Sequence, residues 1–302
     1  MNKVDALNGA LVADAASMGL HWLYDHDQIQ ALQATGEIVF RQPDNSVYEN
    51  RKAFFAHAAR RSGQLSHYGE SARIVGQLAL DGQYTPHNHQ QAFMASFGPC
   101  GSYVGYADRP TKSLIARIIT DGDTLPESSG IEDDQLPALC VIPGLFAACA
   151  QLSVIEQATA VISTHSHVNT ATQVIANCLN AISDGESLSD ALEKSAQTAD
   201  PELAAKLSEA LNWSKYQPLA VSAHFGMACK IHQGLPVAWH LLKHATEFEG
   251  AVRDNTLCGG DSCGRAMVIG AVAGYVFGVP SSMIDRLSDS RIPINFPESK
   301  TN

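Results

Sequence analysis

The chain has 302 residues, a formal net charge of −11 and 45% hydrophobic residues. This composition is typical of a globular protein that buries a large core, either as one big domain or as two closely packed ones. Its 20 lysines and arginines form no basic cluster, whereas nucleic-acid binding requires clustered positive charge. The composition therefore argues against a nucleic-acid partner.

The cysteines and the N-terminus indicate a reducing compartment. Seven cysteines are scattered without a Cys-x-x-Cys pair, which favours free thiols over a disulfide framework. Asp5 and Asp14 interrupt the apolar N-terminal stretch, and a signal peptide would not carry them. The uncharged run after Arg265 stops at Pro280, which is short of a membrane span. We expect a cytoplasmic protein with no membrane partner.

Residues 4–18 are rich in alanine, and small residues recur at every fourth position from Gly9 to Ser17. This spacing predicts a helix with one small-residue face. Asp14 lies among apolar neighbours, so we interpret it as a buried carboxylate with polar partners; the alternative places it at the edge of a site. The aromatic segment 21–25 suits either a pocket wall or a plug in the core.

Residues 36–64 show no sustained period and contain many turn-forming residues, which predicts a long loop or insertion. Residues 63–71 then lead into an amphipathic helix over 72–80. Glu70 lies at this helix start, where the helix dipole favours a carboxylate. The alternative is that Glu70 is a metal or substrate ligand.

The pattern predicts another helix over 86–97, with His87 and His89 in its first turn. We expect both histidines to face solvent rather than to bind metal. The next segment, 101–112, is rich in glycine and tyrosine. It suits a loop that covers a ligand, because glycines allow movement and tyrosines offer stacking faces.

Three acidic residues precede the next apolar helix, which includes residues 139–146. They follow the polar turn 121–130 and lie within the segment 131–135. Asp133 and Asp134 are either helix caps with solvated charge or oxygen ligands for a hard cation or ribose hydroxyls. The two interpretations are about equally favoured.

The remaining chain before residue 258 again shows a helical period. A helix over 154–163 ends at a His-x-His segment, His165 to His167, which lacks the further ligands that zinc requires. Residues 216–222 read as a connector. Further helices are expected at 171–182, 187–198, 201–213, 235–244 and 248–255. No stretch alternates as a strand does, so the predicted fold class is all-α.

The segment Cys258–Arg265 combines two glycines, a carboxylate and a hydroxyl directly before an apolar run. This is how a helix start presents polar groups to a site. In the run that follows, Ala266 and three glycines lie four residues apart. We therefore predict a buried helix whose small-residue stripe packs closely against the first helix.

Three of these segments, in this order, resemble motifs of the ADP-ribosylglycohydrolase family, which includes J1-crystallin. Residues 9–15 resemble its opening Gly-Ala-hydrophobic-x-Gly-Asp-Ala helix, and Thr164-His165 resembles its middle Thr-His segment. The segment 258–262 resembles its closing Gly-Gly-Asp-Thr-Asp motif. The resemblance spans nearly the whole chain and implies one orthogonal multi-helix domain over residues 1–302. Residues 290–302 are expected to form a flexible tail.

Members of this family typically hold two Mg²⁺ ions between an early Thr-Asp-Asp cluster and the late Asp-x-Asp. Hard cations bind oxygen ligands, and a metal pair needs several carboxylates. This chain has Glu70 as the one acid at the early cluster, and Cys263 stands where the second late acid would be. Arg265 adds a positive charge nearby. We therefore expect one Mg²⁺ ion or none, with Glu70, Asp261 and Ser262 as its ligands.

The resemblance implies a hydrolase that cleaves an N- or O-glycosidic bond of an ADP-ribosyl or related ribosyl substrate, either a small molecule or an ADP-ribosylated partner. Negative charge near the anomeric carbon favours the oxocarbenium-like transition state. The candidate catalytic residues are Glu70, Asp133, Asp134 and Asp261. The candidate substrate-binding residues are Tyr103, Tyr106, His165, Gly260 and Arg265; Arg265 would bind a pyrophosphate or carboxylate.

Two alternatives remain open at this point. The loss of paired acids favours a non-catalytic descendant that binds a nucleotide-like ligand or serves as a stable crystallin-like protein. Cysteine chemistry by Cys258 or Cys263 with His165 would need an environment that stabilises a thiolate. We rank it below both other hypotheses.

Overall fold

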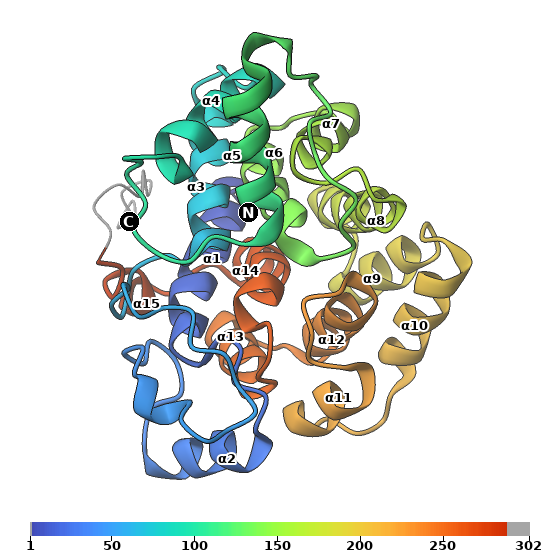
Figure 1. Ribbon diagram of the computed structural model, residues 1–302. Coiled ribbons are helices and arrows are strands. Elements are labelled where there is room, and N and C mark those ends of the chain that lie inside the picture. Colours follow the sequence, from blue (N-terminus) through green and yellow to red (C-terminus); the bar gives the residue numbers. More distant parts are fainter. Residues whose placement is uncertain (1, 289–302) are drawn as a thin grey trace, which may run out of the picture.

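A computed structural model describes residues 2–288 of the chain (Figure 1). Within these residues it is helical and contains no named strand, as the periodicity predicted. The elements are α1 (Val4–Ser17), η1 (Met18–Leu20), α2 (His26–Thr35), η2 (Asn45–Val47), α3 (His67–Leu80), α4 (Pro86–Phe97), α5 (Arg109–Asp121), η3 (Gly122–Thr124), η4 (Leu136–Val141), α6 (Ile142–Ala147), α7 (Leu152–Ile162), α8 (Ser166–Ser183), α9 (Leu188–Ala196), α10 (Pro201–Asn212), α11 (Pro218–Phe225), α12 (Ile231–His244), α13 (Phe248–Leu257), α14 (Ser262–Phe277) and α15 (Ser281–Ile284). The tail predicted at 290–302 lies outside the described residues.

Helices α1 and α14 form the centre of the molecule and lie against each other although they are far apart in sequence (Figure 1). Every residue of α14 from Ser262 to Tyr275 is buried, so the helix is covered on all sides. A Cβ added at Gly9 would lie 2.1 Å from the Gly270 carbonyl oxygen, and one at Gly270 would lie 2.4 Å from that of Gly9. The predicted close approach of the two small-residue faces is confirmed.

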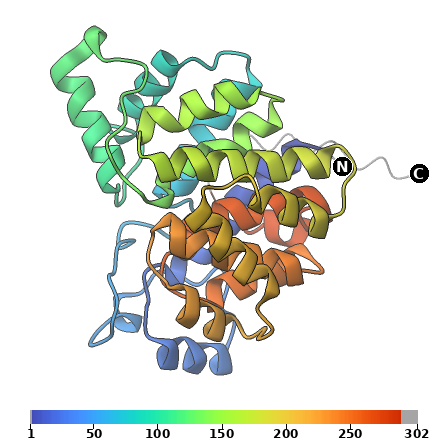
Figure 2. The ribbon, with the colours of Figure 1, turned by 90° about the vertical axis from the view of Figure 1, so that its right-hand side faces the viewer.

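The other helices cover this central pair. Helices α3, α6 and α13 pack directly on it, and α12 adds a further contact with α14. In Figure 1, α4 to α7 lie above the centre, α9 to α12 lie to its right, and α2 lies below it. Figure 2 shows the same arrangement from the side. No helix in residues 2–288 is both long and apolar enough to cross a membrane.

Three local expectations were wrong. Residues 109–112, expected in a loop, begin α5, because the Asp108 side chain caps Thr111 N at 2.7 Å and Pro110 suits a first turn. The connector expected at 216–222 contains α11, which also starts with a proline. The helix expected over 139–146 is divided into η4 and α6, with Pro143 in the first turn of α6.

The long irregular segment over 36–64 contains no helix beyond η2, as expected. Its second half is held against the segment after η1: Tyr24 N donates to Lys52 O at 2.9 Å, and Phe54 N donates to Trp22 O at 3.0 Å. These two bonds attach the irregular segment to the core near the start of α14. It therefore supplies side chains to the site described below.

His89 is fully buried, so the expectation that it faces solvent was wrong. Its ring packs on Phe93 with 4.6 Å between ring centroids, and Nδ1 lies 3.4 Å from the Tyr84 hydroxyl. Burial lowers the pKa of His89 to about 3. The imidazole is therefore neutral in the folded protein near neutral pH.

The pKa of His89 predicts a loss of stability in acid. Between about pH 6.5 and 3 the unfolded chain binds a proton at this residue that the folded protein does not, so stability falls as pH falls. From pH 6.5 to 5 the loss is about 2 kcal/mol. We expect His89→Leu to remove this part of the pH dependence of urea unfolding. The exposed His87→Leu should leave the slope unchanged, and identical slopes for wild type and His89→Leu would contradict the assignment.

Candidate functional site

Asp261 caps the start of α14 and is the best-connected acid of the candidate site. Gly259 and Gly260 precede it with positive φ angles of 63° and 60°, which glycine adopts without strain. A Cβ at Gly260 would lie 2.1 Å from Met227 O, so this position also has no room for a side chain. The turn places Asp261 Oδ1 3.1 Å from Gly264 N, as the motif predicted for a helix start.

The Asp261 carboxylate receives two further hydrogen bonds from buried side chains. His21 Nε2 lies 2.8 Å from Oδ1, and the Tyr68 hydroxyl donates to Oδ2 at 2.9 Å. All three residues are at most 1% exposed. Burial alone raises the pKa of Asp261, but the His21 N–H, nearby positive charge and the Gly264 N–H together hold it below the ordinary value. Asp261 is therefore a fixed, buried negative charge.

A row of histidines continues from Asp261. His21 Nδ1 lies 2.7 Å from His57 Nε2, and the neighbouring His67 Nε2 lies 3.3 Å from Asp108 Oδ2. Desolvation lowers the pKa of both His21 and His57, so both rings are neutral near pH 7. Sequence reasoning treated His21 as a pocket wall or core plug and missed His57. No local signal marks His57, which lies in the irregular segment.

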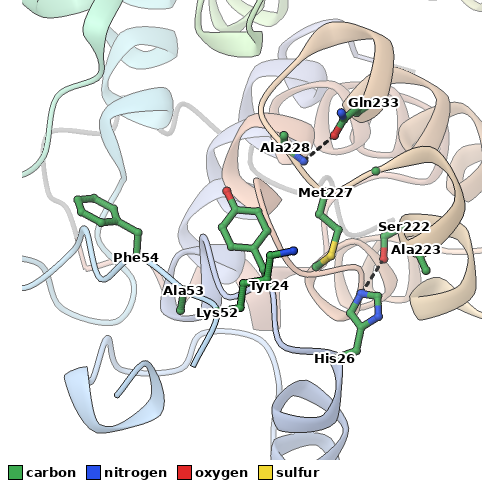
Figure 3. Close-up of a pocket in the computed structure, with 11 residues that line it drawn as sticks. Tyr24, His26, Lys52, Ala53, Phe54, Ser222, Ala223, Met227, Ala228 and Gln233 are labelled. Carbon is green, nitrogen blue, oxygen red and sulfur yellow. Dashed lines mark hydrogen bonds between the residues drawn. The ribbon is translucent and has the colours of Figure 1, made fainter. Parts of the chain in front are cut away.

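An open cavity of about 760 Å³ lies beside the Asp261 loop (Figure 3). It is lined by Tyr24, His26, Lys52, Ala53, Phe54, Ser222, Ala223, Gly226, Met227, Ala228 and Gln233. Two of the segments that carry these residues bond directly to the loop: Gly260 N donates to Leu23 O at 2.7 Å, and Asp261 N donates to Met227 O at 2.9 Å. The loop therefore lies behind two segments that line the cavity and does not line it itself.

Aromatic rings stand between the cavity rim and the buried histidines. Phe54 is 53% exposed and lies 5.9 Å from the half-buried Tyr106, measured between ring centroids. Tyr106 in turn lies 5.1 Å from Trp22 and 5.3 Å from His67. Of the two tyrosines expected to bind substrate, Tyr106 therefore lies close to the cavity.

Tyr103 lies elsewhere in the same loop. It is 8% exposed, and the Arg60 guanidinium lies over its ring at 4.8 Å. It does not line the cavity beside the Asp261 loop. His165 lines a separate hollow of about 450 Å³, next to Glu132 and Glu156. The structure thus does not bring Tyr103 or His165 to the same cavity as Tyr24 and Met227.

Asp133 and Asp134 lie beside the segment that forms one cavity wall. Their chain pairs with that segment through a bridge between Gln135 and Lys230, and Asp134 forms an ion pair with Lys230 at 2.8 Å. Asp133 is 4% exposed, and its Oδ1 accepts from Gln135 N at 3.1 Å. Burial raises the pKa of Asp133. A carboxylate with a raised pKa accepts a proton more readily than one with an ordinary pKa, so Asp133 suits proton transfer.

Glu70 has hydrogen-bond partners different from those of Asp261. Its carboxylate accepts two bonds from Arg73, at 3.0 and 2.8 Å, and one from Ser96 at 2.6 Å. Ser262 donates its hydroxyl to Ser17 O at 3.2 Å. These hydrogen bonds of Glu70 and Ser262 differ from those of Asp261 to His21, Tyr68 and Gly264 N, and the joint role of the three residues as metal ligands stays a prediction.

These contacts allow a test of whether the side chains fit two Mg²⁺ ions. Mg²⁺ binds oxygen ligands that converge on one point. Among residues 2–288, the group of three or more acidic, histidine or cysteine ligand atoms that does converge is His21, His57 and Cys263, with no carboxylate in it. Each oxygen of Asp261 and Glu70 already accepts a hydrogen bond. This donor set does not fit a magnesium pair.

Arg265 braces the Asp261 loop instead of facing the cavity. It is fully buried; its Nε donates to Asn255 Oδ1 at 3.0 Å and its Nη2 donates to Gly259 O at 2.6 Å. Arg265 does not line the cavity, and its role in binding a substrate anion stays a prediction. Backbone and amide oxygens at the end of α13 take up its Nε and Nη2 donors, whereas Nη1 has no partner among the described residues.

The brace predicts a loss of stability when Arg265 is replaced. Arg265→Met removes donors from three buried oxygens of Asn255 and Gly259, so we expect the free energy of unfolding to fall by about 3 kcal/mol. Arg253→Met is the matched control, because that side chain is 53% exposed and its ion pair contributes little. Urea unfolding measures both. Equal midpoints for the two variants would contradict the brace.

The fold and site define the chain as an all-helical protein with a carboxylate-capped central helix beside an open cavity. The sequence profile described as ADP-ribosylglycohydrolase matches residues 3–296. The chain therefore belongs to the ADP-ribosylglycohydrolase family.

Two individual proteins are similar to it. Crystallin J1A of Tripedalia cystophora is 24% identical over 97% of this chain and 94% of its own length. A solved structure of an ADP-ribosylglycohydrolase-related protein complex superposes with a TM-score of 0.68 at 16% identity, covering 94% of this chain and 91% of that one. The solved structure supports the all-helical fold.

Proposed function

We propose that the protein is a divergent hydrolase that cleaves the glycosidic bond of an ADP-ribosyl or related ribosyl substrate. The observation that carries the proposal is the buried Asp261 carboxylate, which His21, Tyr68 and Gly264 N hold in its charged form directly behind Met227, a residue that lines the open cavity. A fixed negative charge favours a reaction whose transition state gains positive charge.

The cavity has the groups that an ADP-ribose-like ligand needs. Exposed Phe54 and neighbouring Tyr106 offer faces on which a base can stack, at about 1–3 kcal/mol per stacked base. Lys52 on the same wall offers a positive charge to a pyrophosphate. Ser222 and Gln233 on the opposite wall offer hydrogen bonds to ribose hydroxyls.

The proposed chemistry divides the work between two acids. Asp261 stabilises the positive charge that develops at the anomeric carbon as the glycosidic bond breaks. Asp133, with its raised pKa, accepts a proton from the attacking water and gives it up to the leaving group, so that both products leave neutral at the broken bond. The sequence left open whether the protein binds one Mg²⁺ ion or no Mg²⁺ ion. The proposal is that it binds no Mg²⁺ ion, because the oxygens of Asp261 and Glu70 are already hydrogen-bonded.

A second candidate is a non-catalytic, crystallin-like or ligand-binding role. Two observations favour it: the similarity to crystallin J1A and the complete burial of Asp261, which keeps its carboxylate from direct contact with solvent. In this second candidate the cavity binds a nucleotide-like ligand without cleaving it, or the helical core serves for stability alone.

Release of free ADP-ribose from one N-linked and one O-linked ADP-ribosyl model compound distinguishes the two candidates. We expect the metal-free protein to release ADP-ribose from at least one of them, and to do so more slowly when Asp133 is replaced by Asn. The exposed Asp81→Asn serves as the control. Binding of ADP-ribose without release from either compound would support the second candidate and contradict the first.

A further inference from the structure

The histidine row leads to a third kind of side chain that the proposed chemistry does not use. A ring nitrogen from His21, a ring nitrogen from His57 and the Cys263 sulfur all lie within 4.8 Å of one another. The three residues are at most 1% exposed. They come from the segment after η1, from the irregular segment and from the first turn of α14, so only the fold brings them together.

The hydrogen bonds fix which nitrogen each ring presents. Asp261 accepts from His21 Nε2, so the hydrogen of that ring is on Nε2 and Nδ1 carries a lone pair. His21 Nδ1 is the atom that faces His57 Nε2 at 2.7 Å. The contact between carboxylate and histidine matches the arrangement that orients metal-bound imidazoles in proteins.

The hydrogen-bond chain from Asp261 through His21 to His57 ends at a nitrogen without a partner among the described residues. If His57 Nε2 donates to His21 Nδ1, the other nitrogen, His57 Nδ1, holds a lone pair. That nitrogen is buried and has no hydrogen-bond partner among the described residues. Buried polar atoms in proteins nearly always have a partner, so the hydrogen bonds of His57 do not account for its burial in this cluster.

We propose that His21, His57 and Cys263 form a binding site for a thiophilic divalent cation of the Zn²⁺ class, which goes beyond the proposed hydrolase function. Two imidazoles and one thiolate are the donor set that zinc prefers, and they exclude Mg²⁺, which binds oxygen. A water molecule completes the tetrahedron in the fourth position.

The geometry needs a small adjustment to hold the ion. Zinc–nitrogen bonds of about 2.0–2.1 Å in a tetrahedron separate the two nitrogens by roughly 3.3 Å, so the rings move apart by about 0.6 Å from their present contact. On binding, the thiol proton of Cys263 leaves to solvent. The proton on His57 moves from Nε2 to Nδ1, which leaves Nε2 free to bind the metal.

Cobalt substitution of the full-length protein tests the site directly. Addition of Co²⁺ to the metal-free protein should produce visible bands of a tetrahedral ion and a near-ultraviolet thiolate-to-cobalt band, both saturating at one equivalent. Zn²⁺ should displace Co²⁺, and an excess of Mg²⁺ should not. If wild type gives no thiolate band, the proposal is wrong.

Variants assign the ligands. Cys263→Ser should abolish the thiolate band. Loss of a residue that only hydrogen-bonds to a metal ligand weakens metal binding by roughly 10–100-fold, and His57→Gln, which removes a ligand itself, should weaken Zn²⁺ binding by more than this. Cys178→Ala removes a buried thiol in α8 and should change nothing. Circular dichroism confirms that each variant is folded. A thiolate band that survives in folded Cys263→Ser would overturn the assignment.

The metal readout is independent of the proposed hydrolase activity. If the protein binds Co²⁺ through a thiolate but releases no ADP-ribose, the proposed metal site is supported and the proposed hydrolase function is contradicted. If the protein releases ADP-ribose but shows no thiolate band, the proposed hydrolase function is supported and the proposed metal site is contradicted.

Discussion

Replacing Gly9 with alanine is expected to lower the free energy of unfolding by about 3 kcal/mol or more, because the added carbon would force α1 and α14 apart. A Cβ there would lie 2.1 Å from the Gly270 carbonyl oxygen and 2.9 Å from the Gly274 Cα. Both obstacles are backbone atoms in the buried part of α14. Neither can move aside as a flexible side chain would, so the whole helix must shift.

Urea unfolding compares this variant with a matched glycine. A Cβ at Gly36 would meet nothing within 4 Å, and its backbone is extended, so Gly36→Ala should stay within about 0.5 kcal/mol of wild type. An unfolding midpoint for Gly9→Ala equal to that of Gly36→Ala would show that the two central helices are not in close contact.

Replacing Asp261 with asparagine is expected to have the largest effect on function. The Asn side chain has nearly the same shape, but its NH₂ group would face one of the donors that now point at the carboxylate: His21, Tyr68 or Gly264 N. A buried donor without an acceptor costs about 1–3 kcal/mol. Loss of the fixed charge should also slow release of ADP-ribose by about 10²–10³-fold, as when one stabilising group of a transition state is removed.

Asp254→Asn is the control for this substitution. Asp254 is also nearly buried and accepts a hydrogen bond from a tyrosine, Tyr216, but it lies on α13 and its carboxylate has no hydrogen bond to His21, Tyr68 or Gly264 N. We expect Asp254→Asn to lower stability and to leave turnover unchanged. If both variants lose turnover equally, the effect is structural and Asp261 has no special role.

The sequence predicted those parts of the molecule that local spacing encodes. Small residues at every fourth position from Gly9 and from Ala266 mark faces that must pack closely, and both faces meet in the structure. Helix starts at Pro86 and Pro201 follow from proline's preference for the first turn. The start of a helix after Gly259 and Gly260 was predicted, whereas the capping role of Asp261 comes from the structure.

Other features depend on contacts between distant segments, which no local pattern reveals. His57 lies in an irregular segment, and only the fold places it 2.7 Å from His21. The charge of Arg265 suggested an anion as its partner, and only the fold shows that oxygens at the end of α13 accept from its Nε and Nη2. Burial of His89 was missed because its neighbours His87 and Asn88 are polar.

The central claim is that the cavity beside the Asp261 loop binds an ADP-ribose-like ligand, and calorimetric titration of ADP-ribose into the metal-free protein tests it most directly. We predict binding without added Mg²⁺, weakened about 10-fold by Phe54→Ala through the loss of base stacking. Val104→Ala, at a residue 65% exposed outside the cavity, should leave affinity unchanged. Absence of binding, or binding that Phe54→Ala does not weaken, would contradict the claim.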